Sequence, residues 1–352
     1  MKRDLPPKPG RAAGPGEFLF SAAGLAHGHI YGMTRGLLDA GATLDAVWDE
    51  DPQKVAAFCR AFPQARAAES LDALLGDARV QLVASAAVPA ERCALGLRVM
   101  AAGKDYFVDK APVTTLEQLA QARRAAGETG RKYMVYYSER LHSEAATFAD
   151  FLIREGEIGR VLHLDGFGPH RLGAEPRPAW FFEKARYGGI LCDIGSHQLE
   201  QFLYFTGAQD AAITSARKAN YAHPAQPEFE DFGDCTVLAP NGATGYFRVD
   251  WFTPDGLSTW GDGRTFILGT EGYIELRKYV DVASGRPGGN MVYWANQKGE
   301  FRFDATDRVG CPFFARLIRD CMERTETAMT QAHAFKAAEL CLQAQALADR
   351  AP

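Results

Sequence analysis

Segments of strand length and helix length alternate along residues 18–137, and this alternation limits the possible folds more than any other feature. Short apolar segments are separated by longer segments with helical periodicity. The expected strands are residues 18–23, 43–48, 80–86, 106–108 and 133–137, and the expected helices are residues 29–40, 52–62, 90–102 and 115–127. The pattern predicts an α/β fold with a parallel, doubly wound sheet, which binds ligands at the carboxyl ends of its strands.

The pattern changes after about residue 140. Helices are expected at residues 143–155, 193–197, 313–324 and 331–348, and strands, divided by Gly, Asn and Pro turns, at residues 161–167, 211–218, 236–239, 244–250, 265–268 and 273–277. These segments predict a second, α+β domain with a large, open, mostly antiparallel sheet. We therefore expect a flexible extension at residues 1–17, a first domain at residues 18–139 and a second at residues 140–352.

Composition narrows the class of ligand. A chain of 352 residues exceeds the usual size of one core, so two domains with a cleft between them are expected. A net charge of −5 without a sustained basic run argues against nucleic acid or an anionic membrane as a partner. Residues 1–17 lack the apolar core of a signal peptide, and the chain has no apolar run long enough to span a bilayer. We expect a cytoplasmic protein that binds small molecules.

The cysteines do not indicate a metal or a disulfide framework. The seven are scattered, odd in number and never arranged as Cys-x-x-Cys. His27 and His29 are expected to be turn residues, because no further acidic or sulfur ligand lies at a typical spacing from them. No metal is expected.

Residues 188–200 carry the clearest chemical signal. Asp193 and His197 lie four residues apart at the start of an expected helix, and four residues advance a helix by about 400°. The two side chains would then share one face, where a carboxylate can orient an imidazole; a purely structural polar pair is the alternative. Lys110 lies at the end of an expected strand, and a surface lysine after a strand is the alternative interpretation for it. If all three meet in one cleft, they could move a proton on a substrate hydroxyl while a cofactor takes the hydride.

The turn after the first strand is a candidate phosphate-binding site. Its residues 24–29 read Gly-Leu-Ala-His-Gly-His, and only Gly24 clearly fits the G-x-G-x-x-G pattern. Ala26 takes the place of the second glycine, and Gly28 is shifted by one position. A tight turn into a helix without a dinucleotide is the alternative.

Asp49 strengthens the dinucleotide interpretation. It closes the second strand about 25 residues after Gly24, where an acidic side chain accepts from the adenosine ribose hydroxyls. Glu50 and Asp51 follow it, rather than an arginine that could pair with a 2'-phosphate, so NAD is favoured over NADP. An N-cap before Pro52 is the alternative role, compatible with the first.

Three motifs in order carry a family resemblance. Residues 102–112 are similar to A-G-K-x-V-x-x-E-K-P, with Asp109 in place of the glutamate and one residue inserted before the proline. Residues 188–197 match G-G-x-x-x-D-x-G-x-H, and residues 269–272 are similar to a late G-T-x-G turn. Over about residues 18–350 the chain resembles the glucose-fructose oxidoreductase, inositol dehydrogenase and MocA (Gfo/Idh/MocA) family, which implies a Rossmann domain followed by an open-sheet domain.

The resemblance also implies roles. His197 would be the general base, Asp193 would orient it, and Lys110 would bind the reacting substrate oxygen or the nicotinamide ribose. The residues implied to bind NAD are Gly24, Ala26, His27, Gly28, Asp49 and Lys110. A helix N-terminus and a cation near a developing alkoxide suit this chemistry.

Two segments before residue 188 are candidates for sugar recognition. His170 and Arg171 could donate hydrogen bonds to hydroxyls, and Trp180 could cover the C–H face of a ring. Core packing is the alternative for Trp180.

The sequence thus predicts an NAD(P)-dependent dehydrogenase acting on a secondary hydroxyl or ketone of a sugar, glycoside or cyclic polyol. Two alternatives stay open: an NAD-retaining glycosidase that works by transient oxidation and elimination, and a non-catalytic dinucleotide-binding sensor. An open sheet with aromatic residues suggests, by analogy, a homodimer or homotetramer.

Overall fold

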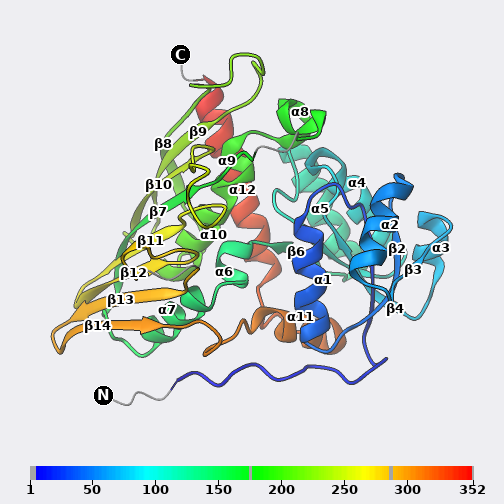
Figure 1. The fold of residues 1–352 in the computed structure, drawn as a ribbon, viewed down its shortest axis with the longest axis horizontal. Coiled ribbons are helices and arrows are strands. Elements are labelled where there is room, and N and C mark those ends of the chain that lie inside the picture. The colour runs from blue at the N-terminus through cyan, green and yellow to red at the C-terminus, as the bar shows by residue number, and fades with distance from the viewer. Residues whose placement is uncertain (1–4, 174–176, 285–287, 351–352) are drawn as a thin grey trace.

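The computed structural model describes residues 5–173, 177–284 and 288–350, which form two sheets with helices between and around them (Figure 1). The first sheet has six parallel strands in the order β3-β2-β1-β4-β5-β6. Its strands are β1 Leu19–Ala23, β2 Thr43–Trp48, β3 Arg66–Ala67, β4 Val80–Ser85, β5 Asp105–Asp109 and β6 Tyr133–Tyr136. Its helices are α1 His29–Asp39, α2 Pro52–Ala61, α3 Leu71–Gly76, α4 Pro89–Ala101 and α5 Leu116–Thr129. The predicted doubly wound parallel sheet is confirmed.

The second sheet has eight strands in the order β14-β13-β12-β11-β7-β10-β9-β8, and of its neighbouring pairs only β7 and β10 run parallel. The strands are β7 Val161–Pro169, β8 Ala212–Ala219, β9 Phe232–Leu238, β10 Thr244–Asp250, β11 Arg264–Gly269, β12 Gly272–Arg277, β13 Met291–Asn296 and β14 Gly299–Asp304. This confirms the open, mostly antiparallel sheet. The sequence did not predict β3, α3, β13 or β14.

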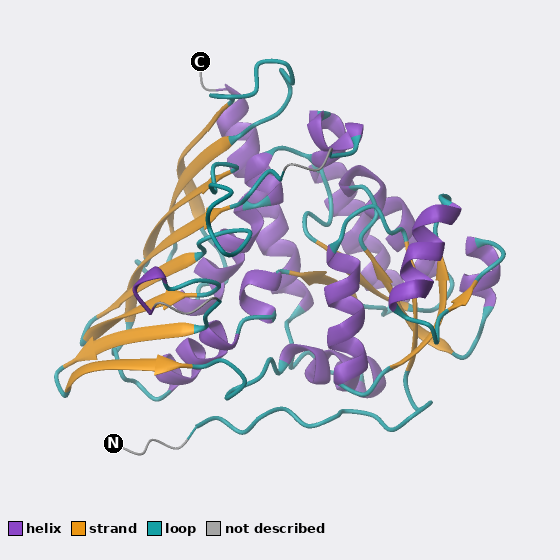
Figure 2. Ribbon diagram, viewed as in Figure 1, coloured by secondary structure: helices purple, strands orange, loops and turns teal. Residues whose placement is uncertain are grey.

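The helices of the second domain lie mainly between the two sheets (Figures 1 and 2). They are α6 Ser138–Leu141, α7 Glu144–Arg154, α8 Lys184–Tyr187, α9 Ile190–Asp193, α10 Gly195–Thr206, α11 Phe313–Glu323 and α12 Gln331–Arg350, with short 3-10 turns at Ala179–Phe182 and Val282–Ser284. α12 packs on β8 and α10 of the second domain and on α5 and β6 of the first. The long helix therefore holds the two domains together.

The other face of the large sheet carries no helix in Figure 2. Apolar side chains are exposed on it, and along β11 they alternate with buried ones, as expected for a sheet covered on one side. Those on β9, β11 and β12 are Leu238, Phe266, Leu268 and Tyr273. Among the described helices, none is both long and apolar enough to cross a membrane.

The amino-terminal segment runs in extended form past both domains from Leu5 onward (Figure 1). Ala12 N donates to Ala40 O at 2.8 Å, and Gly16 N donates to Thr43 Oγ1 at 2.9 Å. A Cβ on Gly310 would lie 2.7 Å from Pro9, so the segment also contacts the second domain. The described part of the expected loose extension is thus attached to the fold.

Candidate active site

An ion pair between the two domains marks the centre of the site. Lys110 directly follows β5, and its Nζ lies 2.5 Å from Oδ1 of Asp193, the last residue of α9. Burial raises the pKa of Asp193, but the ammonium of Lys110 outweighs it and holds that pKa below its usual range. The pair lies at the carboxyl end of β5, where a doubly wound sheet is expected to bind its ligand.

His197 lies in the first turn of α10 with 1% of its surface exposed. Burial lowers the pKa of His197 to about 3, although the carboxylate of Glu139 opposes that shift. The imidazole is therefore neutral at neutral pH, which is the form that accepts a proton. Within the described part of the chain, its Nδ1 has no hydrogen-bond partner.

The expected contact between Asp193 and His197 is not formed. The Asp193 carboxylate is bound to Lys110 instead, because the ammonium reaches it from across the domain boundary. The four-residue spacing suggested a partner within the same helix, but a cation from another domain is a stronger partner for a carboxylate than a neutral imidazole. The carboxylate of Asp193 thus binds Lys110 rather than His197.

His27 and His29, in the turn after β1, both contact the carboxylate of Asp109. His29 Nδ1 lies 2.8 Å from Oδ1 of Asp109, and His27 Nδ1 lies 3.4 Å from Oδ2. The acidic neighbour that the local spacing did not show therefore comes from β5. These three residues bring possible metal-ligand atoms within 4.8 Å of one another.

Hydrogen bonds already occupy both oxygens of Asp109. Arg92 Nη2 lies 3.1 Å from Oδ2, and the backbone N–H of Lys110 donates to Oδ1 at 2.9 Å. Burial raises the pKa of Asp109, but His29 and Arg92 hold it well below its usual range. Asp109 therefore links the two histidines of the nucleotide turn to Arg92 and to the backbone of Lys110.

The nucleotide turn has the backbone that a close approach requires. Gly24 has φ +76°, and a Cβ there would lie 2.7 Å from Cβ of Ala87. Gly28 is the N-cap of α1 and brings no side-chain hydrogen bond to it. The amides of residues 29–31 are already engaged, since they donate to Nδ1 of His27 and to the carbonyl oxygens of His27 and Gly28 at 3.2, 3.3 and 3.2 Å. The close approach at Gly24 is therefore the feature of this turn that suits a pyrophosphate.

Asp49 supports this turn directly. Its Oδ2 accepts from Leu25 N at 2.6 Å, and its Oδ1 accepts from Asp51 N at 2.9 Å. The alternative role of Asp49 as a helix cap is wrong, because Asp51 is the N-cap of α2 and accepts from Gln53 N at 2.8 Å.

A cavity of about 520 Å³ opens at the carboxyl ends of β1, β2 and β4. Gly24, Ala26 and Asp49 line it. The sequence suggested no basic side chain near Asp49, but Lys54, Arg98 and Arg186 line the same cavity. The second domain contributes to it through Arg186 and Trp180, so Trp180, which we expected to face the substrate, lies beside the nucleotide turn's cavity instead.

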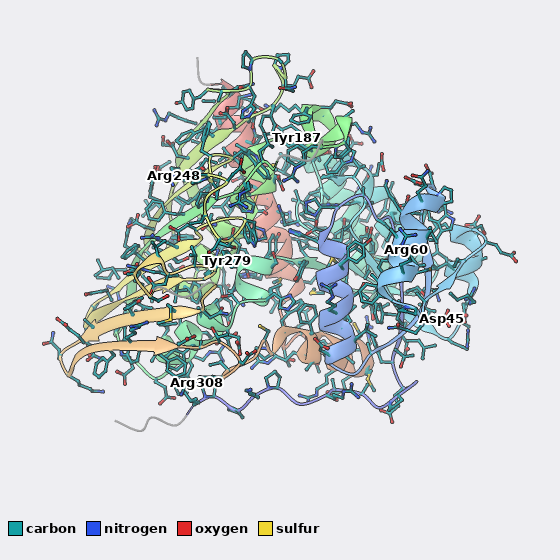
Figure 3. The ribbon with its side chains drawn as sticks, viewed as in Figure 1. Asp45, Arg60, Tyr187, Arg248, Tyr279 and Arg308 are labelled. Atoms are coloured by element: carbon teal, nitrogen blue, oxygen red, sulfur yellow. The ribbon has the colours of Figure 1, made fainter. Side chains whose placement is uncertain are left out.

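His170 follows β7 and lies within the electrostatic reach of the ion pair. Burial lowers the pKa of His170 to about 4; Glu139 and Asp193 oppose this shift, and Lys110 adds to it. The ring lies 5.4 Å from that of Trp251 and 4.5 Å from that of Trp260. The ring of Tyr279, labelled in Figure 3, lies 4.5 Å from that of Trp260. His170 therefore lies between the aromatic rings of Trp251 and Trp260 and the charged groups Lys110 and Asp193.

Arg171 is engaged elsewhere. Its Nη2 donates to the carbonyl oxygens of Pro254, Leu257 and Thr259 at 3.0, 2.6 and 2.9 Å. The guanidinium thus fixes the loop after β10, and these donors are not free for a sugar hydroxyl.

Two charged residues near the site were missed. Glu139 follows β6 on α6, and its Oε2 lies 3.0 Å from Nζ of Lys278. The position just after a parallel strand was a usable signal for Glu139. No local pattern in the sequence indicated Lys278, because only the folded chain brings the segment after β12 into contact with α6.

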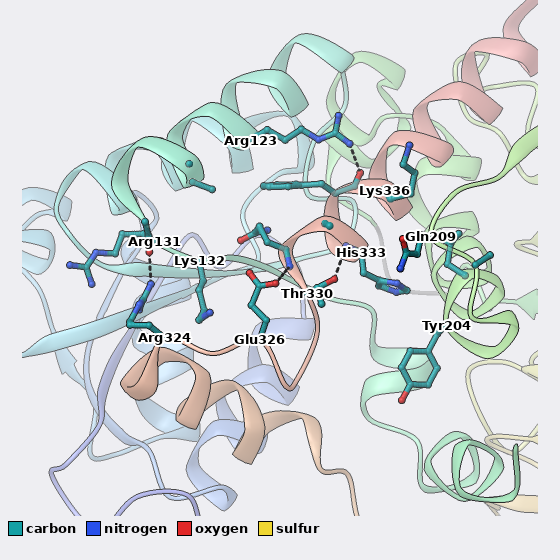
Figure 4. Close-up of a pocket in the computed structure, with 18 of the residues that line it drawn as sticks. Arg123, Arg131, Lys132, Tyr204, Gln209, Arg324, Glu326, Thr330, His333 and Lys336 are labelled. Atoms are coloured by element: carbon teal, nitrogen blue, oxygen red, sulfur yellow. Dashed lines mark hydrogen bonds between the residues drawn. The ribbon is translucent and has the colours of Figure 1, made fainter. Parts of the chain in front are cut away.

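A larger cavity, of about 1050 Å³, lies elsewhere, between α5, α10 and the start of α12 (Figure 4). Arg123, Arg324 and Lys336 line it, and each pairs with a carboxylate, Glu339, Asp105 and Asp210 respectively. None of its described lining residues belongs to the predicted site, so its size does not make it the active centre.

Comparisons with known proteins agree with this geometry. Residues 23–137 match the model of the oxidoreductase family with an NAD-binding Rossmann fold, GFO/IDH/MocA, and residues 149–275 match the GFO/IDH/MocA C-terminal domain. A protein of known crystal structure from Erwinia carotovora atroseptica is 54% identical, with a TM-score of 0.91 over 94% of this chain and 99% of that chain. The chain belongs to the GFO/IDH/MocA family. Its first domain is an NAD(P)-binding Rossmann domain.

Two curated relatives of this GFO/IDH/MocA member have named activities. D-xylose dehydrogenase from Paenarthrobacter nicotinovorans is 29% identical over 36% of this chain and 34% of its own length. The NADP(+) scyllo-inositol 2-dehydrogenase IolW from Bacillus subtilis is 26% identical over 44% of this chain and 43% of its own length. Both alignments span less than half of the relative.

Proposed function

We propose that the protein is an NAD(P)-dependent oxidoreductase that interconverts a secondary hydroxyl and a ketone on a sugar, glycoside or cyclic polyol. The observation that carries this proposal is the Lys110–Asp193 ion pair between the domains, with a buried, neutral His197 in the same electrostatic field. The named activities of the two curated relatives, a sugar dehydrogenase and an inositol dehydrogenase, support the substrate class.

The side chains divide the proton chemistry between them. In the oxidation direction, neutral His197 accepts the proton of the substrate hydroxyl. The ammonium of Lys110 lies against the same oxygen and stabilises the negative charge that develops there, and Asp193 holds the ammonium in place. His170 and the Trp251 and Trp260 rings would contact the rest of the ring-shaped substrate.

A nicotinamide dinucleotide, when bound, supplies the hydride acceptor or donor. The residues that would hold it are Gly24, Ala26, His27, Gly28 and Asp49. The fit rests on the cradle at Gly24, which a Cβ would fill, and on the cavity that Gly24, Ala26 and Asp49 line. Asp49 has used one acceptor site on each oxygen, so further sites remain for the ribose hydroxyls, and its charge disfavours a 2'-phosphate. NAD is therefore the proposed cofactor.

A panel of aldoses, inositols and glycosides, tested separately with NAD and NADP, examines the proposal. We expect reduced nicotinamide, seen by its absorbance, to appear with at least one polyol and to require Lys110 and His197. Release of an aglycone without net NADH would indicate a glycosidase instead. Dinucleotide binding without turnover on any member of the panel would favour the sensor.

We also propose that copies of the chain associate through the uncovered face of the large sheet. Phe266, Leu268 and Tyr273 are exposed there on neighbouring strands. Light scattering should give the mass of a dimer or tetramer, and a double Phe266→Lys, Leu268→Lys variant should be smaller. A wild-type monomer would refute this.

A further inference from the structure

A second carboxylate, that of Glu139, lies near His197 and is buried away from solvent. Glu139 is 1% exposed, and its Oε2 is bound by Nζ of Lys278 at 3.0 Å and by Nε2 of Gln198 at 2.8 Å. The side chain of Lys278 is itself fully buried. Oε1 of Glu139 is buried too, and among the described residues it has no hydrogen-bond partner. One carboxylate oxygen is thus anchored while the other stands free.

The carboxylate of Glu139 lies next to the turn of α10 that carries His197. Gln198 adjoins His197 in sequence, and Nε2 of Gln201 donates to the backbone oxygen of His197 at 2.9 Å and to Oε2 of Glu139 at 3.4 Å. Nδ1 of His197 is also buried without a partner in the described residues, as is the amide oxygen Oε1 of Gln198, which can only accept and so cannot pair with a carboxylate oxygen. An ionised carboxylate oxygen can only accept, and an imidazole nitrogen can donate, so Oε1 of Glu139 and Nδ1 of His197 are complementary.

The groups around His197 give Glu139 a distinct effect. Burial lowers the pKa of His197 most, and Lys110, His29 and His170 lower it further, whereas Glu139 raises it. Asp193 on α9 is bound to Lys110. Burial raises the pKa of Glu139, but Lys278 and then His197 bring it to about 2, so the carboxylate is ionised at neutral pH. Glu139 is therefore the negative charge that faces the imidazole.

We propose that Glu139 positions His197 for proton transfer, a role that rests on the proposed dehydrogenase function. Its Oε1 accepts from Nδ1–H of His197, directly or through one water, which leaves the lone pair of Nε2 for the substrate. In the oxidation, the substrate O–H bond breaks and its proton goes to Nε2, while the C–H bond of the same carbon breaks and its hydride goes to the dinucleotide, which leaves a carbonyl. The carboxylate then stabilises the imidazolium, and Lys278 holds the carboxylate in place. Asp193 and Glu139 thus serve different partners.

Turnover and its pH dependence test the role. Glu139→Gln should lower kcat about a hundredfold while KM for the polyol stays close to wild type, because the interaction grows as the imidazolium forms. Loss of the negative charge lowers the pKa of His197, so the acid limb of the kcat profile should move to lower pH. Glu139→Asp should restore part of kcat and should move the acid limb part of the way back toward its wild-type pH. An unchanged limb together with normal kcat would overturn the proposal.

A charge-balanced variant separates positioning from folding. Glu139→Gln leaves an ammonium buried without its partner, so the double variant Glu139→Gln, Lys278→Met removes both charges together. We expect it to keep the wild-type Tm and to remain about a hundredfold slower than wild type. A double variant as fast as wild type would show that the pair only supports the fold.

The tautomer of His197 can be read without any activity. In protein with ¹⁵N-labelled histidine, the His197 signals are assigned by their loss in His197→Asn. We expect the Nδ1–H tautomer in wild type and a larger Nε2–H share in Glu139→Gln. An Nε2–H tautomer in wild type would overturn the role of Glu139 even in an active dehydrogenase. An Nδ1–H tautomer in a protein that oxidises no polyol would refute only the proposed function.

Discussion

The site contains two lysine–carboxylate pairs that differ in where they lie and what surrounds them. Lys278 and Glu139 belong to the second domain and are 0% and 1% exposed. Lys110 and Asp193 come from different domains, and Asp193 is 14% exposed. The first pair is closed in by the amides of Gln198 and Gln201, whereas the second lies at the carboxyl end of β5. Only the second can exchange part of its contacts for a ligand.

This difference separates stability from catalysis. A buried ion pair contributes little net stability against apolar replacements, but removing one member leaves an unpaired charge, which costs a great deal. A pair that is partly open to solvent has water to replace a lost partner. Removal of one member of the closed pair should therefore lower stability as well as turnover, whereas removal of one member of the open pair should mainly lower turnover.

Lys278→Met should give the largest effect. The carboxylate of Glu139 would remain buried without its cation, so the free energy of unfolding should fall by about 3–5 kcal/mol. Urea denaturation followed by fluorescence measures this. The matched control is the double variant with Glu139→Gln, which should recover most of the loss. A single variant as stable as wild type would mean that the two pairs do not differ as their burial implies.

Lys110→Met should lower turnover more than it lowers stability. Removing the cation at the reacting oxygen should lower kcat about 100- to 1000-fold, with a change in unfolding free energy smaller than that of Lys278→Met. Lys298→Met is the control, because Lys298 is exposed and pairs with Glu157 at 3.4 Å, outside the site. Normal turnover in Lys110→Met would remove the lysine from the proposed chemistry.

The sequence predicted the first domain well and the second less completely. Regular alternation and strong apolar periodicity located β1, β2, β4, β5 and β6 to within a residue or two. β13 and β14 were both missed: β14 mixes polar and apolar residues, whereas β13 is mostly apolar and carried a usable signal. β3 is only two residues long, too short to carry a period.

The site was predictable only where its signal is local. Lys110, Asp193 and His197 stood in motifs, and the structure brings them into one electrostatic neighbourhood. Their partners were not predictable, because a pairing between Lys110 and Asp193, or between Glu139 and Lys278, joins residues far apart in the chain. A single sequence shows which residue types are present but not which charge another domain will supply.

Acid should weaken the closed pair within a defined pH range. The pKa of Glu139 is about 2 in the folded protein against an ordinary value of 4.5. Its stabilisation is therefore present above pH 4.5 and is lost as the pH falls toward 2. Urea midpoints across this range should change less with pH in the Glu139→Gln, Lys278→Met variant than in wild type. Parallel profiles would show that the carboxylate is not held ionised by its partners.

A third pair, Asp49 with Lys54, extends the comparison to an exposed case and should give the smallest effect. Lys54 Nζ lies 3.9 Å from Asp49 Oδ1 and is 42% exposed, so Lys54→Ala should alter stability by less than about 1 kcal/mol. Asp49→Ala should lower NAD affinity by about tenfold and NADP affinity less, because the carboxylate accepts from the ribose hydroxyl and repels a 2'-phosphate. Lys54→Ala should instead weaken NADP more than NAD. Titration calorimetry with both dinucleotides measures how each variant changes the preference for NAD over NADP, and the two changes must have opposite signs if the exposed pair acts on the ligand rather than on the fold. Wild-type protein that binds NADP more tightly than NAD would refute the preference assigned to Asp49.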